Sequence, residues 1–161
     1  MRRTAADPAM VRWLEQVMPS ALRCQQCGEC ASVCPSQRHD GIRPAELMAR
    51  ASLGAEDPAE DRKLWQCARC MACSERCPSD ADPGEMIALL RELAVQKGNR
   101  PQYFIEEAKR FLQTGICFPR TGMTRKMRKE LGLPDGETAA HALKDVAEIC
   151  ERTGLGRLKL E

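Results

Sequence analysis

Eight of the ten cysteines in this 161-residue chain fall in two short runs that share one spacing. The first run is C-Q-Q-C-G-E-C-A-S-V-C-P over residues 24–35, and the second is C-A-R-C-M-A-C-S-E-R-C-P over residues 67–78. Both read C-x2-C-x2-C-x3-C-P, which is typical of thiolates that bind four-iron clusters. The sequence therefore predicts two [4Fe–4S] clusters as cofactors.

The spacing also predicts which cysteines share a cluster. In such a run the first three cysteines bind one cluster, and the fourth reaches across to the other. The proline after the fourth cysteine stops a helix that would turn that sulfur elsewhere. We call the two predicted groups the first ligand set, Cys24, Cys27, Cys30 and Cys77, and the second ligand set, Cys67, Cys70, Cys73 and Cys34. We predict no catalytic residue in this chain.

Other uses of cysteine fit the sequence less well. Zinc sites more commonly pair two C-x2-C knuckles that end after the second cysteine. Disulfide scaffolds are usually shorter and secreted, whereas residues 1–8 lack the apolar segment of a signal peptide. The apolar run at 86–90 is far short of the ~20 residues that span a membrane. We expect no transmembrane segment, and a cytoplasmic protein that can be peripheral to a membrane through its partners.

Charge gives little support to a nucleic-acid partner. The 25 basic and 23 acidic residues give a net charge of +2 when each cysteine counts as a neutral thiol, and two bound clusters would bring the total to about −2. A basic patch in the C-terminal third is interpreted as a solvated helix face or as a docking surface for an acidic partner, because no aromatic residues interleave with its charges. It comprises Arg120, Arg125, Lys126, Arg128 and Lys129.

The elements that must position the cysteines are all predicted to be helical. Helix-start prolines and apolar residues at helical spacing predict helices over residues 8–18, 44–54, 83–98, 101–115, 124–131 and 138–152, and a capping box predicts another from 57 towards 65. The cysteine runs repeat with a period of 43 residues, and a helix follows each run. The expected fold is all-α, and no strand pattern competes with it.

We expect three segments in the chain. They are an N-terminal helical arm over residues 1–20, a cluster-binding domain over 21–98 and a C-terminal helical extension over 99–161. The amphipathic helices at 8–18 and 138–152 offer apolar faces, and we expect at least one of them to dock on a partner.

The remaining chemical side chains have ordinary interpretations. Cys150 lies on the apolar side of its helix and Cys117 lies in a loop, so buried thiols are the simpler interpretation and a redox pair is the alternative. His39 and His141 are expected at the surface or in caps. Trp65, two residues before Cys67, is expected to shield a cluster from water or to pack in the core.

Beyond the cysteines, the sequence resembles the C-type iron–sulfur subunit of heterodisulfide reductase, over roughly residues 10–155. The segment between the cysteine runs also resembles that of the α-helical ferredoxin domain, as in the iron–sulfur subunits of fumarate reductases. The resemblance rests on CQQCGEC at 24–30, LWQC at 64–67, CSERCP at 73–78, LRELA at 90–94 and RKELGLP at 128–134. It implies an electron relay between a flavin-bearing A-type subunit and a cysteine-rich B-type subunit whose non-cubane clusters act on a disulfide or thiol. The resemblance does not distinguish a subunit of the methanogenic enzyme from a subunit of the related heterodisulfide-reductase-like complexes of bacteria, including those of sulfur oxidation.

Three alternatives remain at this stage. Iron–sulfur subunits of the glycolate oxidase or glycerol-3-phosphate dehydrogenase type share the cysteine pattern, but they carry a cysteine-rich catalytic repeat downstream. Here 84 residues follow Cys77, with two cysteines and no Cys-Cys pair among them, so the catalytic partner is expected to be another chain. A thiol–disulfide protein that uses Cys117 and Cys150, and a zinc-stabilised nucleic-acid module, are the other two.

Overall fold

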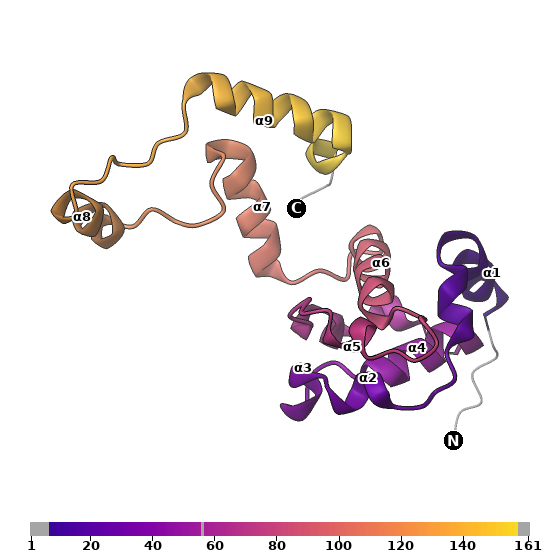
Figure 1. The fold of residues 1–161 in the computed structure, drawn as a ribbon. Coiled ribbons are helices and arrows are strands. Elements are labelled where there is room, and N and C mark those ends of the chain that lie inside the picture. The colour runs from indigo at the N-terminus through magenta and orange to yellow at the C-terminus, as the bar shows by residue number, and fades with distance from the viewer. Residues whose placement is uncertain (1–6, 56, 158–161) are drawn as a thin grey trace. The chain divides into compact units, whose positions relative to one another are not determined.

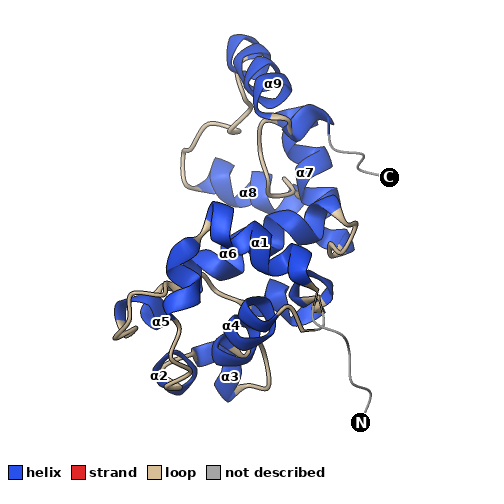
Figure 2. Ribbon diagram, turned by 90° about the vertical axis from the view of Figure 1, so that its right-hand side faces the viewer, coloured by secondary structure: helices blue, strands red, loops and turns tan. Residues whose placement is uncertain are grey.

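The computed structural model describes residues 7–55 and 57–157, and across these ranges the regular elements are all helices (Figure 2). The predicted all-α fold is confirmed. Contacts divide the chain into two compact units, residues 1–100 and 101–161, and each is described by itself. The division lies two residues beyond the predicted end of the cluster-binding domain.

The first unit contains both cysteine runs and a sequence of short helices (Figure 1). Its elements are α1 (Pro8–Val17), the 3₁₀ helix η1 (Pro19–Arg23), α2 (Glu29–Ser32), α3 (Pro35–Arg38), α4 (Pro44–Leu53), the 3₁₀ helices η2 (Pro58–Glu60) and η3 (Arg62–Gln66), α5 (Ala72–Glu75) and α6 (Pro83–Gln96). The completely or almost completely buried side chains of its core include Leu14, Ile42, Leu47, Met48, Leu64, Met86, Ile87 and Leu90. The core therefore draws on α1, α4, η3 and α6 together.

The 43-residue sequence repeat is also a structural repeat. We call residues 19–53 the first repeat and 62–96 the second. Both contain a 3₁₀ helix, a cysteine loop, a one-turn helix and a longer helix, and the first repeat has an additional one-turn helix, α3, before α4. The two loops follow the same backbone path, since φ is positive at Gln26 (54°) and Arg69 (55°), and again at Gly28 (83°) and Met71 (61°). The one-turn helices α2 and α5 contact each other, as do the longer helices α4 and α6.

The predicted N-terminal arm packs into the first unit. Helix α1 contacts α4 and η1. Leu14 is fully buried and Met10 and Met18 nearly so, whereas Val17 is 46% exposed. This chain's own core therefore covers most of the apolar face of one of the two helices that we expected to offer a docking face. Asp7 caps the helix, because its Oδ1 accepts a hydrogen bond from the Ala9 amide at 2.8 Å.

Residues 57–66 differ from the single helix that the capping box predicts. The carboxylate of Asp57 accepts a hydrogen bond from the amide of Ala59, and that of Asp61 accepts one from the amide of Lys63, each at 2.9 Å. Each aspartate thus caps a short turn of its own, η2 or η3. The second cap ends the first turn and begins a new 3₁₀ helix, η3, which carries Trp65 and leads directly to Cys67.

The second unit consists of α7 (Gln102–Thr114), α8 (Gly122–Glu130), α9 (Ala140–Thr153) and the 3₁₀ helix η4 (Leu155–Arg157). Helices α7 and α9 pack together, whereas α8 buries none of its residues. Within the ranges that the structure describes, no helix is both long enough and apolar enough to cross a membrane.

Candidate iron–sulfur sites

The structure gathers the cysteines of the first ligand set around one cavity. Cys24, Cys27 and Cys30 line it from the first run, and Cys77 lines it from the second. The cavity encloses about 300 Å³ of space free of protein atoms, including the part open to solvent. Ala45 from the start of α4 and Pro83 from the start of α6 close its walls.

The second ligand set surrounds a matching cavity. Cys67, Cys70 and Cys73 line it from the second run and Cys34 lines it from the first, around about 380 Å³ counted in the same way. Its walls include Pro44 and Gly84, which are the counterparts of Pro83 and Ala45 in the other cavity. In both cavities three cysteines thus come from one run and one from the other.

The positions of the sulfurs follow from the local backbone. Cys30 and Cys73 each stand in the first turn of a one-turn helix, α2 or α5, and are buried, whereas the middle cysteines Cys27 and Cys70 are exposed. Burial raises the pKa of the Cys30 thiol to about 11, with smaller contributions from the neighbouring thiolates Cys24 and Cys73. Cys73 belongs to the other set, and the helices that carry these two cysteines, α2 and α5, contact each other, so the two cavities are close neighbours.

Backbone amides point at one sulfur in each set. The Ala81 amide donates a hydrogen bond to Cys77 Sγ at 3.2 Å, and the Arg69 amide donates one to Cys67 Sγ at 3.4 Å. Burial would raise the pKa of Cys77, but the hydrogen bonds to its sulfur together lower it. Such donors stabilise the thiolate, the form that binds metal.

The donor set fits a cluster better than a single ion. Across residues 7–55 and 57–157, no three His, Cys, Asp or Glu side chains converge closely enough to hold one metal ion. A zinc ion would need four ligands within about 2.3 Å of a single centre. A [4Fe–4S] cluster spreads its four cysteines over four irons, which suits four thiols that line one cavity from two separate runs.

A hydrogen-bond network fixes the start of α6 beside the second cavity. The Asp82 carboxylate accepts a hydrogen bond from the Glu85 amide at 3.2 Å and another from the Ser74 hydroxyl. Ser74 Oγ in turn accepts one from the Gly84 amide at 2.9 Å. The network ties α5, which carries Cys73, to the helix that forms the cavity wall.

Two arginines near the second cavity were not among the predicted site residues. Arg69 donates from Nη1 to the Gly84 carbonyl oxygen at 2.9 Å. Arg91, from α6, donates to the carbonyl oxygens of Leu64 (2.9 Å) and Cys67 (2.6 Å), and its guanidinium lies 5.5 Å from the Trp65 ring centroid. Comparing the two cysteine runs position by position would have singled out Arg69, because the first run has Gln26 there. Arg91 pairs with Ser52 only when α4 and α6 are aligned from their first residues.

The other residues that the sequence singled out lie apart from these cavities. Trp65 is half-buried against the core, and its indole N–H donates to the Asn99 carbonyl oxygen at 3.2 Å. His39 lines a shallow surface hollow with Pro35 and Gln66. In the second unit Cys150 is buried and Cys117 half-buried, and neither is among the residues that line the two cavities.

Comparison with known proteins agrees with this geometry. A family model described as a 4Fe-4S dicluster domain matches residues 20–81. The C-type iron–sulfur subunit 2 of the CoB–CoM heterodisulfide reductase of Methanocaldococcus jannaschii is 34% identical over 148 residues, which cover 91% of this chain and 78% of that protein. This chain belongs to the family of heterodisulfide reductase C-type iron–sulfur subunits.

Two further relatives extend the family match across both units. The C2 subunit of the H2/formate:CoB–CoM heterodisulfide, ferredoxin reductase of Methanococcus maripaludis is 34% identical, over 91% of this chain and 79% of its own. The C-type subunit of the ferredoxin:CoB–CoM heterodisulfide reductase of Methanosarcina mazei is 35% identical, over 81% and 85%. The predicted resemblance to this family and the predicted [4Fe–4S] cofactors are therefore confirmed.

Proposed function

We propose that this C-type subunit relays electrons through two adjacent cluster sites, between a flavin-bearing A-type subunit and a B-type subunit that acts on a disulfide or thiol. The observation that carries the proposal is that each cavity takes three cysteines from one run and one from the other. Such crossing holds the two sites next to each other, and close sites favour electron transfer. When bound, each cluster can accept and release one electron.

We assign the ligands as the two predicted sets. The chain's part is to hold eight thiolates, to keep water from Cys30, Cys34 and Cys73 by burial, and to leave Cys27 and Cys70 at the surface. An exposed edge at each site suits a relay that receives an electron from one protein and passes it to another.

The test is iron and sulfide analysis of the anaerobically purified chain, which should contain about eight of each. Cys34→Ser should then alter the spectroscopic signal of the site formed by Cys67, Cys70 and Cys73, and Cys77→Ser that of the other site. Cys117→Ser serves as the control, with unchanged iron content. Zinc without sulfide, or disruption by each variant of the site in its own run, would contradict the proposal.

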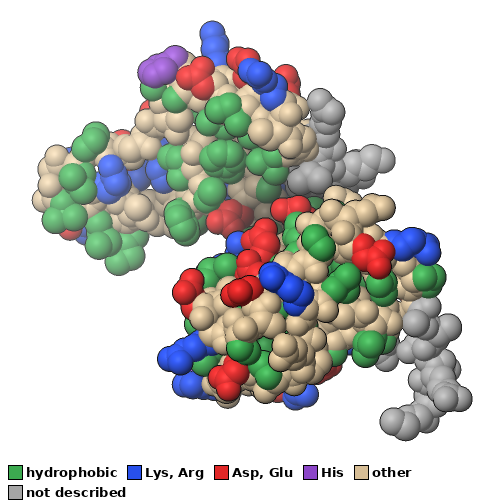
Figure 3. All heavy atoms as spheres, turned by 45° about the vertical axis from the view of Figure 1, so that its right-hand side comes forward, with side chains coloured by type: hydrophobic (Ala, Val, Ile, Leu, Met, Phe, Trp, Pro, Cys, Tyr) green, Lys and Arg blue, Asp and Glu red, His purple; other side chains and the backbone are tan. Residues whose placement is uncertain are grey.

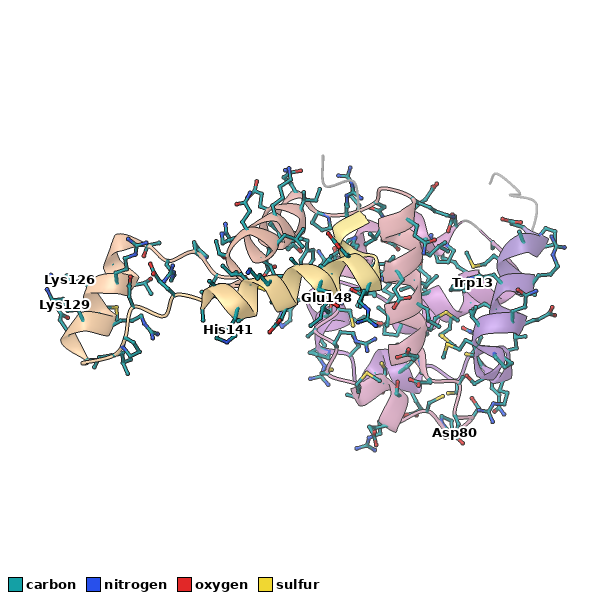
Figure 4. All side chains as sticks on the ribbon, turned by 90° about the horizontal axis from the view of Figure 1, so that it is seen from above. Trp13, Asp80, Lys126, Lys129, His141 and Glu148 are labelled. Atoms are coloured by element: carbon teal, nitrogen blue, oxygen red, sulfur yellow. The ribbon has the colours of Figure 1, made fainter. Side chains whose placement is uncertain are left out.

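We further propose that α8 docks on the B-type partner. Met123, Met127 and Leu131 recur every four residues and are 72%, 51% and 70% exposed, which leaves an apolar stripe uncovered in this unit (Figure 3). Methionine suits an adaptable contact surface. Lys126 and Lys129 project outward from the same helix (Figure 4), so the complementary surface is an apolar groove with an acidic rim.

Docking can be tested with the full chain and the co-expressed B-type partner. The double variant Met123→Ser/Leu131→Ser should raise Kd at least tenfold, as removal of central apolar anchors commonly does. Leu53→Ser is the matched control, because Leu53 is 66% exposed but belongs to the first unit. Equal affinity of all three chains, or binding of α8 to anionic lipid vesicles in place of the partner, would contradict this assignment.

A further inference from the structure

The two cluster sites differ in the charges that surround them. Apart from its cysteines, the cavity of the first ligand set has one charged residue in its described lining, Glu29, and that of the second set has one, Arg69. The counterpart of Glu29 in the second repeat is Ala72, and that of Arg69 in the first repeat is Gln26. Both differences make the second site more positive than the first.

Gln26 and Arg69 occupy matching places in the two loops. Arg69 Nη1 donates to the carbonyl oxygen of Gly84, at the start of α6. One terminal atom of the Gln26 amide lies 3.1 Å from the carbonyl oxygen of Ala45, at the start of α4, and the other lies 3.2 Å from Cys24 Sγ. With its amide nitrogen facing the Ala45 carbonyl oxygen, Gln26 donates to the start of α4 as Arg69 donates to the start of α6, but without a charge.

A third difference is Arg91 of α6, which contacts the backbone of the second cysteine run. The guanidinium of Arg91 donates to the backbone carbonyl of Cys67 at 2.6 Å, and it is half-buried. Counting from the first residues of α4 and α6, its counterpart is Ser52, whose buried Oγ has no hydrogen-bond partner in the structure. A positive charge in a partly buried place is screened less by water than one at the surface.

We propose that Arg69 and Arg91 make the second ligand set the site of higher reduction potential, so that the electron passes from the first set to the second. Reduction adds one negative charge to a site, and nearby positive charge stabilises it, since the net charge around a cluster helps to set its potential. One electron leaves the site of Cys24, Cys27, Cys30 and Cys77 and enters the site of Cys67, Cys70, Cys73 and Cys34, so each site changes by one charge in opposite directions. This inference rests on the ligand sets of the proposed function.

Some groups act in the opposite direction. The Ala81 amide bonds Cys77 Sγ of the first set at 3.2 Å, which is shorter than the 3.4 Å bond that Cys67 receives. Arg23 also lies near the first set, where it donates to the Asp80 carbonyl oxygen at 2.8 Å. Glu85 lies 3.7 Å from Arg69 and offsets part of its charge. Arg23 and Arg69 are both exposed, so water screens their charges alike. Arg91 is half-buried and has the uncharged Ser52 as its counterpart, and Glu29 adds a negative charge to the lining of the first cavity, so the balance favours the second set.

The test is a redox titration of the cluster-loaded full chain, followed by electron paramagnetic resonance. Cys34→Ser and Cys77→Ser first assign the two signals to the second and the first set. Arg69→Gln copies the first repeat, and Arg91→Lys keeps the charge of Arg91. Arg12→Gln, which removes an exposed charge on α1, is the control.

We expect the second-set signal to titrate at the higher potential. Arg69→Gln should lower the second-set midpoint and leave the first-set midpoint unchanged. We expect the equilibrium constant for electron transfer from the first set to the second to fall roughly tenfold, which is 59 mV for a one-electron couple. Arg91→Lys should leave the second-set midpoint in place, and Glu29→Gln should raise the first-set midpoint. If the Arg69→Gln chain binds fewer irons than the wild-type chain, the test rests on Glu29→Gln, and an unchanged first-set midpoint in that variant would contradict the inference.

Two kinds of contrary result are distinguishable. The inference would be overturned if the first-set signal had the higher midpoint potential. It would also be overturned if Arg69→Gln shifted the second-set midpoint no more than the control Arg12→Gln does. Either result would leave the proposed function intact. A wild-type chain that binds fewer than about eight irons, or gives a single signal, would contradict the ligand sets and so the proposed function itself.

Discussion

Gly84 stands where the second repeat has no room for a side chain. It is buried at the start of α6, and a Cβ there would lie 2.7 Å from Ser74 Oγ and 2.9 Å from both Sδ and Cε of Met71. Carbon atoms in ordinary contact are separated by about 3.5 Å or more. In the first repeat the matching residue is Ala45, and the residue matching Met71 is Gly28, which has no side chain to crowd it.

We predict that Gly84→Ala destabilises the first unit by about 1–3 kcal/mol, the usual cost of overpacking. Ser74 Oγ cannot move away without weakening its bond to the Gly84 amide, which is worth about 1 kcal/mol. Met71→Gly would remove two of the three close contacts. It would also relieve a non-glycine residue at φ +61°, a conformation that costs about 1–2 kcal/mol. The double variant should therefore be at least ~1 kcal/mol more stable than the sum of the two single changes predicts.

The assay is anaerobic guanidinium unfolding, with cluster absorbance and helical circular dichroism recorded together. Gly122→Ala is the matched control, because that glycine begins α8 with open space around its Cα and should leave cluster loss unchanged. Simple additivity of Gly84→Ala and Met71→Gly would refute the steric reasoning, and so would a Gly84→Ala chain as stable as the wild type.

Three further predictions concern caps and one ion pair. Asp82→Ala removes the cap that binds the Glu85 amide and should cost about 1–2 kcal/mol in chemical unfolding, with Asp82→Asn closer to wild type. Arg50→Met breaks the 2.9 Å ion pair between Arg50 and Asp61, whose two side chains are 18% and 25% exposed, respectively. It should lower the unfolding free energy by about 1–3 kcal/mol. A change under ~0.5 kcal/mol would show that the pair is no stronger than a surface ion pair. Thr121→Ala removes the cap of α8 and should reduce helical circular dichroism slightly without changing iron content, whereas lost iron would contradict the separate units.

The sequence predicted the helices well because their ends carry strong local signals. Asp82 and Pro83 begin α6, and Gly54 ends α4 in the left-handed conformation. The predicted helix at 8–18 was also observed, and it was one of the two helices of which at least one was expected to dock on a partner. Periodicity shows that a face is apolar and does not show which surface will cover it, and here that surface is α4 of the same chain.

Other features depend on contacts that no local pattern reveals. Nothing in the sequence of the second run indicates that Met71 adopts the backbone conformation for which the first run uses Gly28. The double turn at 57–66 arises because Asp61 caps its own turn in competition with the helix that Asp57 begins. The differences between Gln26 and Arg69 and between Glu29 and Ala72 follow from the sequence at the 43-residue period. The pairing of Ser52 with Arg91 became visible only when the structure aligned α4 with α6.

The crossing of the two cysteine runs has a consequence for the origin of the domain. A chain with one run alone would supply three cysteines to its own site and one to another, so it could complete a site only with a second copy of itself. Two such copies related by a twofold axis would form the same pair of cavities, because contacts across such an axis are reciprocal. Duplication and fusion of an ancestral half would have preserved that geometry within one chain. It would also have released the halves from identity, so that one repeat can carry glutamine at 26 and the other arginine at 69.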